Sequence, residues 1–287
     1  MRAALVQLNA SDDPAENLPR TAALVAEAAD QGAQFVLTPE VTNCVSGSRT
    51  HQRAVLQSEA EDETLAGLRG AAATHGIWLL IGSLGLKLPG EDRFANRSFL
   101  IDPEGTIVAR YDKIHMFDVD ISESETYRES EAYRPGDSAV VAEAGFAKIG
   151  MTICYDVRFA YLHRALAHAG AEILTVPAAF STVSGAAHWQ TLLRARAIET
   201  GAWVLAPAQT GQHRVSRGRP RASYGHSLAV SPWGDIVVDA GTGPGAFCFE
   251  MDLGAVADAR CRIPAIHHDR AFAAPGLPLS QARHTRA

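Results

Sequence analysis

Cys154 stands at a position where a thiol can do chemistry. An apolar stretch typical of a strand, residues 147–153, ends on this cysteine, and apolar residues at helical spacing follow from Phe159. A cysteine at such a strand-to-helix turn can present its sulfur to a substrate, and the N-terminus of the following helix favours the reactive thiolate. A buried structural cysteine is the other interpretation of this segment alone, since free cysteine is among the most buried residue types.

Three other polar residues lie just past strand-like stretches or in the loop beyond them. Glu40 comes shortly after the expected strand 34–37, Lys113 follows the expected strand 106–110, and Glu129 lies in an acidic loop. Each of the three, taken alone, fits a solvated side chain in a turn, because Lys and Glu are mostly exposed in proteins. Their significance therefore depends on the four residues being considered together.

Together with Cys154, these residues contain the groups that hydrolysis of an amide by a thiol requires. A glutamate can take the thiol proton and return it to the departing amine. The ammonium of Lys113 and the backbone N–H of Tyr155 can stabilise the oxyanion of the tetrahedral intermediate. A second glutamate beside the lysine would hold it charged and oriented, and would raise the pKa of the first glutamate, because adjacent carboxylates resist joint ionisation.

The elements that must position these residues alternate between helices and strands in both halves of the chain. Hydrophobic periodicity predicts helices over residues 15–31 and 61–75, from just after Cys154 to residue 169, and over residues 186–200. Besides the strand that ends on Cys154, strands are expected at 2–8, 34–37, 77–82, 96–101, 106–110, 172–177, 202–206, 226–230, 236–238 and 246–251.

Several of these strands are expected to form hairpins, and this mixture points to mixed sheets with helices outside them, a layered α/β fold. No linker divides the chain, so we expect a single domain over residues 1–270. Residues 117–137 are expected to be a long irregular loop, and residues 271–287 a loosely held C-terminal tail.

The composition is ordinary for a globular protein and excludes several classes of function. Of the 287 residues, 47% are hydrophobic and 20% charged, and the net charge of −6 at pH 7 disfavours nucleic acid as the main partner. No apolar run is long enough to span a bilayer, and the N-terminus turns polar too soon for a signal peptide, so a cytoplasmic location is expected. The four cysteines lie far apart and form no CxxC pair, so we expect no disulfide framework, no metal site and no cofactor.

Three segments that carry the candidate residues resemble the signature blocks of the nitrilase superfamily of carbon–nitrogen hydrolases. They are residues 37–40, 111–120 and 150–159, in matching order and spacing, and the resemblance covers nearly the whole chain. It implies a four-layer α-β-β-α sandwich. It also implies a homodimer or higher homo-oligomer, in which subunits pack through the helices next to the nucleophile.

The resemblance assigns a role to each candidate residue. Glu40 matches the general base and acid, Lys113 the lysine that stabilises the oxyanion, and Cys154 the nucleophile. Glu129 matches the auxiliary glutamate that orients the lysine.

The branch within the superfamily is indicated by further segments, which are residues 176–180, 188–200, 206–211 and 221–227. They resemble the Nit-type amidases, and most of all the deaminated glutathione amidases. The implied function is a thiol-dependent amidase that hydrolyses a linear amide of a small carboxylated 2-oxo acid through a thioester and releases ammonia or an amine.

Other activities are compatible with the same sequence. They are an omega-amidase acting on α-ketoglutaramate, a carbamoylase or nitrilase, and a nitrilase-fold binding protein with little catalysis. A zinc deaminase and a serine hydrolase are disfavoured, because the chain has neither H-x-E with P-C-x-x-C nor G-x-S-x-G.

An anionic substrate needs a cationic anchor. Arg158, four residues past the nucleophile, is the first candidate because its planar guanidinium suits a carboxylate, although a helix-surface arginine fits equally well. Phe180 and Thr182 are candidates for lining the pocket. Residues 212–221 hold four arginines, which fit either a solvated loop or a basic flap that meets a multiply charged, peptide-like substrate.

Overall fold

Two mixed β-sheets form the centre of the molecule, and their strand pairings follow the same order when the second sheet is taken from β8 to β15. The computed structural model describes residues 1–122 and 125–272. The first sheet, in spatial order, is β16 (Gly245–Glu250), β1 (Arg2–Gln7), β2 (Phe35–Leu37), β3 (Trp78–Lys87), β4 (Phe94–Ile101) and β5 (Ile107–Asp112). The second is β15 (Ile236–Asp239), β14 (Leu228–Val230), β11 (Trp203–Ala206), β10 (Ile173–Thr175), β9 (Lys148–Met151) and β8 (Val140–Glu143).

Each sheet has three parallel strands in its interior and antiparallel strands at both edges. The parallel strands are β1, β2 and β3 in the first sheet and β9, β10 and β11 in the second. Parallel strands need crossover connections, and helices supply them in both sheets. The helices are α1 (Pro14–Asp30), α2 (Arg49–Val55), α3 (Glu63–His75), α4 (Ala160–His168), α5 (Thr182–Thr200) and α6 (Gly254–Arg262), with the short 3₁₀ turns η1 (Glu129–Glu131), η2 (Cys154–Arg158) and η3 (Ala265–His267).

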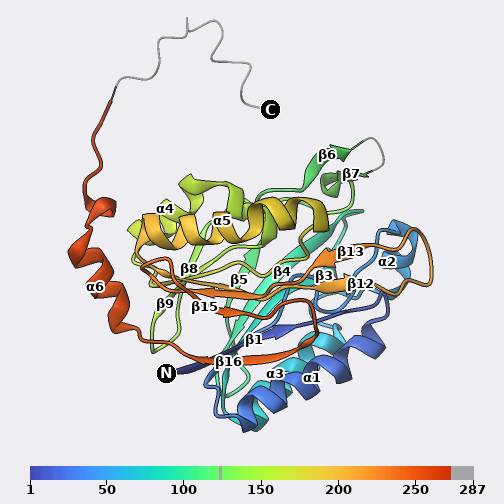
Figure 1. The fold of residues 1–287 in the computed structure, drawn as a ribbon. Helices are drawn as coiled ribbons and strands as arrows, with labels where there is room; N and C mark the ends of the chain where they lie inside the picture. Colours follow the sequence, from blue (N-terminus) through green and yellow to red (C-terminus); the bar gives the residue numbers. More distant parts are fainter. Residues whose placement is uncertain (123–124, 273–287) are drawn as a thin grey trace, which may run out of the picture.

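The helices cover the outer faces of the two sheets, α1 and α3 on one side and α4 and α5 on the other (Figure 1). Alternation along the strands produces this layering, because successive side chains of a strand point to opposite faces. In β1, Ala4 and Val6 pack in the cluster with α1 and α3, whereas Ala3 and Leu5 pack between the sheets. The expected four-layer α-β-β-α sandwich is therefore confirmed.

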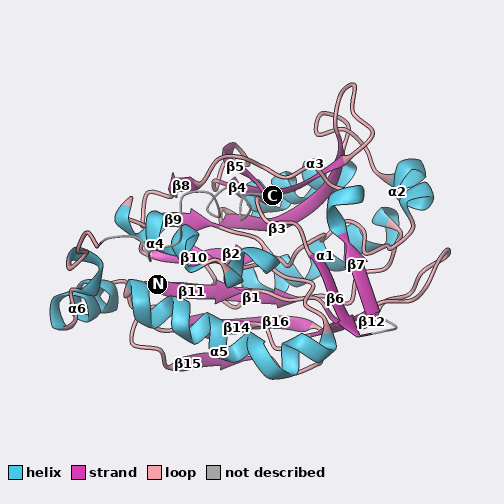
Figure 2. Cartoon of the chain, turned by 90° about the horizontal axis from the view of Figure 1, so that it is seen from above, coloured by secondary structure: helices cyan, strands magenta, loops and turns pink. Residues whose placement is uncertain are grey.

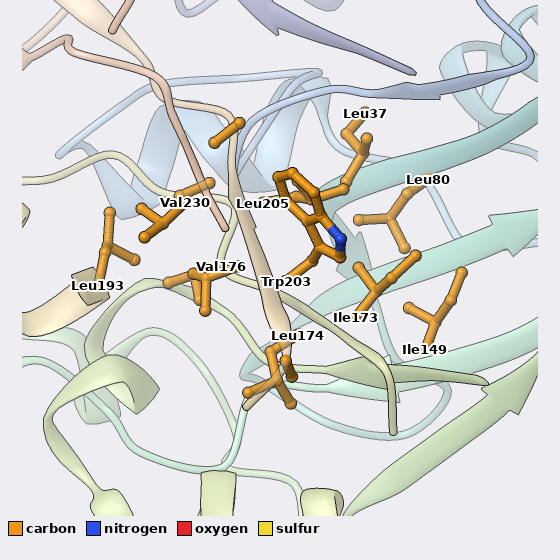
Figure 3. Packing of buried hydrophobic residues seen from close by; sticks show 14 of the residues in the cluster. Leu37, Leu80, Ile149, Ile173, Leu174, Val176, Leu193, Trp203, Leu205 and Val230 are labelled. Carbon is orange, nitrogen blue, oxygen red and sulfur yellow. The ribbon is translucent and has the colours of Figure 1, made fainter. Parts of the chain in front are cut away.

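Apolar side chains from both sheets meet in the core between them. Leu37 and Leu80 of the first sheet face Ile149 and Ile173 of the second, with Trp203 beside them (Figure 3). All these side chains are at most 3% exposed. Close packing of this kind fixes the two sheets against each other, and hence the loops at their ends.

The expected irregular loop over residues 117–137 is wrong in part. It contains a two-stranded ribbon of β6 (Asp118–Ser122) and β7 (Glu125–Arg128), followed by η1. The two strands pair only with each other. The alternation of polar and apolar residues in β6 is only five residues long, and β7, Glu-Thr-Tyr-Arg, has none, so the sequence signal is weak. A second small ribbon joins β12 (Thr210–Gln212) to β13 (Ala222–Tyr224).

Both ribbons and α2 gather at one end of the sandwich, as the views in Figures 1 and 2 agree. No helix in the described part of the chain is both long and apolar enough to cross a membrane. Of the expected C-terminal tail, residues 273–287 lie outside the described residues.

Candidate active site

The four candidate residues are brought together at the end of the sandwich where the ribbons lie. Glu40 follows β2, Lys113 directly follows β5, and Cys154 follows β9, so each stands past the carboxyl end of its strand. Glu129 is the first residue of η1, next to the ribbon β6–β7. The site therefore combines residues from both sheets.

Lys113 links the two glutamates. Its Nζ lies 2.8 Å from Glu40 Oε1 and 2.9 and 2.8 Å from the two oxygens of Glu129. Burial lowers the pKa of Lys113, but the charges of Glu129 and Glu40 outweigh it and hold the pKa well above its usual value. An ammonium has three protons. One can be donated to Glu40 and one can be shared by the two oxygens of Glu129, which leaves the third for an oxyanion.

Glu40 is the carboxylate nearest to the thiol. Burial raises its pKa, but the charge of Lys113 and its hydrogen bond outweigh this effect, so the pKa of Glu40 lies below its ordinary value. The neighbouring Glu129, expected to raise this pKa, does not reverse the direction that the lysine between the carboxylates sets. Glu40 Oε2 accepts a hydrogen bond from the backbone N–H of Ala179 at 2.8 Å, and the Glu40 carboxylate also accepts one from the Cys154 thiol.

Cys154 is a buried thiol in a strained backbone conformation. Its φ is +49°, in the left-handed region, and its N–H donates to the Pro177 carbonyl at 2.9 Å. Burial and the charge of Glu40 raise the pKa of Cys154 well above its usual value. This direction is opposite to the expected effect of a helix N-terminus on the thiol, because burial and the carboxylate beside it disfavour the thiolate.

A buried aspartate holds the turn that carries Cys154. Asp156 accepts hydrogen bonds from the hydroxyl of Tyr111 at 2.7 Å and from the backbone N–H of Ile153 at 2.9 Å. It also accepts from the backbone N–H of His115 at 3.1 Å, and its Oδ1 lies 2.7 Å from His115 Nδ1. The first N–H groups of a helix lack intrahelical acceptors, so that of Tyr155, the second residue of η2, can serve an oxyanion.

Asn96 is a site residue that the sequence does not reveal. Its Nδ2 donates to Glu40 Oε1 at 2.9 Å and to Glu129 Oε1 at 3.3 Å. The only signal is a polar residue within the apolar strand β4, where Asn96 is 1% exposed. A single asparagine in a strand is a weak signal, because its partners come from distant parts of the chain.

Gly82 allows the loops of the two catalytic residues to approach. It lies at the irregularity in the pairing of β3 with β4, and a Cβ at this position would stand 2.0 Å from the Thr38 carbonyl oxygen and 2.6 Å from Pro177 Cβ. Thr38 leads to Glu40, and Pro177 accepts the hydrogen bond from Cys154. Only glycine fits between these two segments without shifting them.

The candidate residues line a cavity of about 580 Å³ that is rich in arginine. Glu40, Lys113, Glu129 and Cys154 lie in its wall, together with Phe180 and Thr182, which we predicted as lining residues. The arginines that line it are Arg49, Arg128, Arg219 and Arg221.

Arg158 does not line this cavity. Its guanidinium lies over the ring of Phe180 at 5.5 Å and contacts His188 Nδ1 at 3.3 Å. Spacing along the chain suggested Arg158 as an anchor, but the turn η2 directs its side chain elsewhere. The arginines in the cavity come instead from α2, from β7 and from residues 212–221.

Among the described residues, no group of three or more His, Cys, Asp or Glu side chains is arranged to hold a metal ion. The chemistry that the site can perform with its own groups is proton transfer, nucleophilic attack and oxyanion stabilisation.

Comparison with known proteins places the chain in a family. The carbon–nitrogen hydrolase family matches residues 2–260. A deaminated glutathione amidase from Yersinia enterocolitica is 38% identical over 276 residues, which cover 93% of this chain and 92% of that protein. An omega-amidase from Xenopus tropicalis is 35% identical over 265 residues, which cover 92% of each protein.

The fold comparison agrees. The crystal structure of Saccharomyces cerevisiae Nit3, a member of branch 10 of the nitrilase superfamily, superposes with a TM-score of 0.81 at 30% identity, and the match covers 92% of this chain and 94% of that one. From the family match, the full-length relatives and the shared fold, it follows that the chain belongs to the carbon–nitrogen hydrolases of the nitrilase superfamily and is an amidase.

Proposed function

We propose that this amidase hydrolyses a linear amide of a small carboxylated 2-oxo acid, of the deaminated glutathione type, through a thioester on Cys154. The observation that carries the proposal is the buried group of Glu40, Lys113 and the Cys154 thiol in the wall of an arginine-lined cavity. It unites a nucleophile, a base and an oxyanion donor at one place, as amide hydrolysis requires.

In the first half of the reaction, the Cys154 sulfur attacks the amide carbonyl carbon while its proton passes to the Glu40 carboxylate, which already accepts a hydrogen bond from it. The carbonyl oxygen becomes an oxyanion that Lys113 Nζ and the backbone N–H of Tyr155 stabilise. The C–N bond then breaks, Glu40 returns the proton to the departing amine, and an acyl thioester stays on Cys154.

In the second half, a water molecule attacks the thioester and gives a proton to Glu40. The same donors stabilise the second oxyanion. The C–S bond breaks, the carboxylic acid product leaves, and the proton on Glu40 restores the Cys154 thiol. Each proton taken by Glu40 is therefore given back within the same half-reaction.

The arginines in the cavity support an anionic substrate. Their guanidiniums match carboxylates in shape and charge, and Arg221 lies close enough to Glu40 that its charge lowers the pKa of that carboxyl. The Yersinia enterocolitica relative is a deaminated glutathione amidase, which supports this substrate class. The second candidate is an omega-amidase acting on α-ketoglutaramate, as the likeness to the Xenopus tropicalis protein supports.

The test is hydrolysis of deaminated glutathione and of α-ketoglutaramate by the wild type, by Cys154→Ala and by Cys44→Ala. Cys44 is a second buried thiol in the wall of the same cavity, so it is a matched control. We expect Cys154→Ala to lose about a thousandfold or more of kcat, and Cys44→Ala to keep most of it. Undiminished turnover by Cys154→Ala would refute the thioester route, and no turnover of either substrate by the wild type would refute the substrate class.

We also propose that the protein forms a homodimer or higher homo-oligomer through α4 and α5. Tyr161 on α4 and Val183 and Ile198 on α5 are 66%, 57% and 55% exposed. These side chains lie on the helices next to the nucleophile, through which the family resemblance implies that subunits pack.

A further inference from the structure

Tyr133 brings to the cavity a hydroxyl group that the proposed mechanism does not use. The residue lines the cavity and is 7% exposed. Its backbone N–H donates to the Glu129 carbonyl oxygen at 2.8 Å. A bond between residues four apart closes one helical turn, so the side chains of Glu129 and Tyr133 lie on the same side of the chain.

The ring of Tyr133 is packed among apolar neighbours, which gives the hydroxyl a fixed place. The centroid of the ring lies 5.8 Å from that of Phe94, and Cys44 and Leu56 complete the cluster. The oxygen itself lies against β3, because a Cβ on Gly85 would come within 3.2 Å of it. The hydroxyl therefore keeps little freedom beyond rotation of its O–H bond.

Gln52 makes the Tyr133 oxygen an acceptor. Its Nε2 lies 2.9 Å from the Tyr133 oxygen and 3.2 Å from the Ser46 carbonyl oxygen. A carbonyl oxygen can only accept a hydrogen bond, so the Gln52 atom between these two oxygens is the amide nitrogen, which donates to both. The hydroxyl proton of Tyr133 must therefore point away from Gln52.

No residue in the described ranges 1–122 and 125–272 accepts this proton. Burial and the charges of nearby groups, among them Glu129 and Glu40, raise the pKa of Tyr133 well above its ordinary value. The group is thus a neutral phenol, close enough to both catalytic carboxylates to respond to their charge. A buried donor without an acceptor is unfavourable, so we expect a molecule in the cavity to accept the proton.

The scissile carbonyl already has its donors. Lys113 and the backbone N–H of Tyr155 stabilise its oxygen in the proposed mechanism, so the Tyr133 proton is available for a different oxygen. The two candidate substrates carry further oxygens in their 2-oxo and carboxylate groups. A simple amide has only the scissile carbonyl oxygen.

We propose that the Tyr133 hydroxyl donates a hydrogen bond to a carbonyl or carboxylate oxygen of the substrate outside the scissile amide, and that Gln52 is the positioning residue that orients it. The inference rests on the proposed function, because that function supplies a substrate with such an oxygen. It assigns a binding role to a residue outside the three signature segments, 37–40, 111–120 and 150–159.

The experiment compares Tyr133→Phe with the wild type in two reactions. In hydrolysis of α-ketoglutaramate and of deaminated glutathione, we expect kcat/KM to fall about tenfold, mainly through KM, because the bond is made before and during the reaction. In addition of acrylamide to Cys154, followed by mass spectrometry of the Cys154 peptide, we expect an unchanged rate, because acrylamide has only its amide oxygen. Tyr224→Phe is the matched control and should change neither reaction, since Tyr224 lies outside the cavity wall.

A double-mutant cycle measures the positioning role of Gln52. Gln52→Met removes the donor at similar volume, and we expect it to lower kcat/KM about threefold when Tyr133 is present. Combined with Tyr133→Phe it should cause no further loss, because the hydroxyl that it orients is then missing. Additive losses would overturn the positioning role.

The remaining outcomes separate this inference from the proposed function. An unchanged kcat/KM in Tyr133→Phe would overturn the hydrogen bond to the substrate. An equal slowing of acrylamide addition would also overturn it, because the hydroxyl would then support the catalytic groups and not the substrate. Both results leave the amidase activity intact. If the wild type hydrolysed neither substrate, the proposed function would fail and the inference with it.

Discussion

At the scale of single residues, the site holds two carboxylates within reach of one ammonium. Such carboxylates would repel each other, and Lys113 and the Asn96 amide, which bridge them, compensate this repulsion. Asn96 fixes the orientation of both acids without adding charge. Motif spacing could predict Glu40, Lys113 and Cys154, but Asn96 and the backbone N–H of Ala179 depend on the folded chain.

Replacing Asn96 by leucine removes the donor between the two glutamates at nearly constant volume. We expect Asn96→Leu to lower kcat by about tenfold or more, because two carboxylate oxygens lose a hydrogen bond. Ser98→Ala is the control, since Ser98 lies two residues along the same strand and donates to the Ile81 carbonyl at 3.1 Å, away from the acids. Steady-state kinetics with thermal unfolding of each variant would measure the effect, and equal kcat for both variants would contradict it.

The lowered pKa of Glu40 predicts the acidic limb of the pH profile. The base must be ionised, so activity is present above its pKa and is lost as the pH falls through it. Because Lys113 and Arg221 hold this pKa below its ordinary value, kcat/KM should stay level down to about pH 5. Arg221→Gln removes one of these charges and should move the limb to higher pH. A wild-type limb near neutrality would disprove the assignment.

At the scale of elements, the position of Gly82 decides how closely the two catalytic loops approach. The sequence indicates the strand but not this role, since a glycine within a strand has several explanations. The ribbon β6–β7 was not predicted because its strands are short and pair outside the two sheets. Arg158 was a candidate anchor for the substrate because it is close to Cys154 along the chain. The turn η2 directs its side chain away from the cavity.

Two glycine-to-alanine substitutions should change the free energy of unfolding in opposite directions. Gly82→Ala would force a Cβ to 2.0 Å from a backbone oxygen, so we expect loss of folding stability and of activity. Gly70→Ala lies in α3, where a Cβ would meet nothing within 4 Å, and should stabilise the protein by about 1 kcal/mol. Urea unfolding of both variants measures this, and a neutral Gly82→Ala would show that the loops can move apart freely.

At the scale of the whole molecule, each sheet contributes part of the site. The alternation of strands and helices in both halves of the sequence predicted two similar layers. The order of the edge strands, including the return of β16 to pair with β1, required the structure, because such pairing joins residues at opposite ends of the chain. The general fold was therefore accessible from the sequence, and the exact edges were not.

The proposed assembly makes a prediction at this scale. We expect the wild type to sediment as at least twice its 30.6 kDa mass, and Val183→Glu with Ile198→Glu to shift it toward the monomer, because each places a charge in an apolar contact. Val108→Glu is the control, since Val108 is 42% exposed on β5, away from α4 and α5. Sedimentation velocity distinguishes these species. A monomeric wild type, or equal dissociation by the control, would count against this interface.

Cys154 is not alone in its left-handed conformation, because Val41, the residue after Glu40, has a φ of +47°. Both positions cost folding free energy for residues with a Cβ, about 1 kcal/mol or more each. The reaction needs a thiol at one of them, so selection for activity retains a backbone that selection for stability would remove. A descendant of this protein that no longer needed catalysis could therefore become more stable by replacing its nucleophile with glycine, and its inactivity would be a mark of relaxed selection.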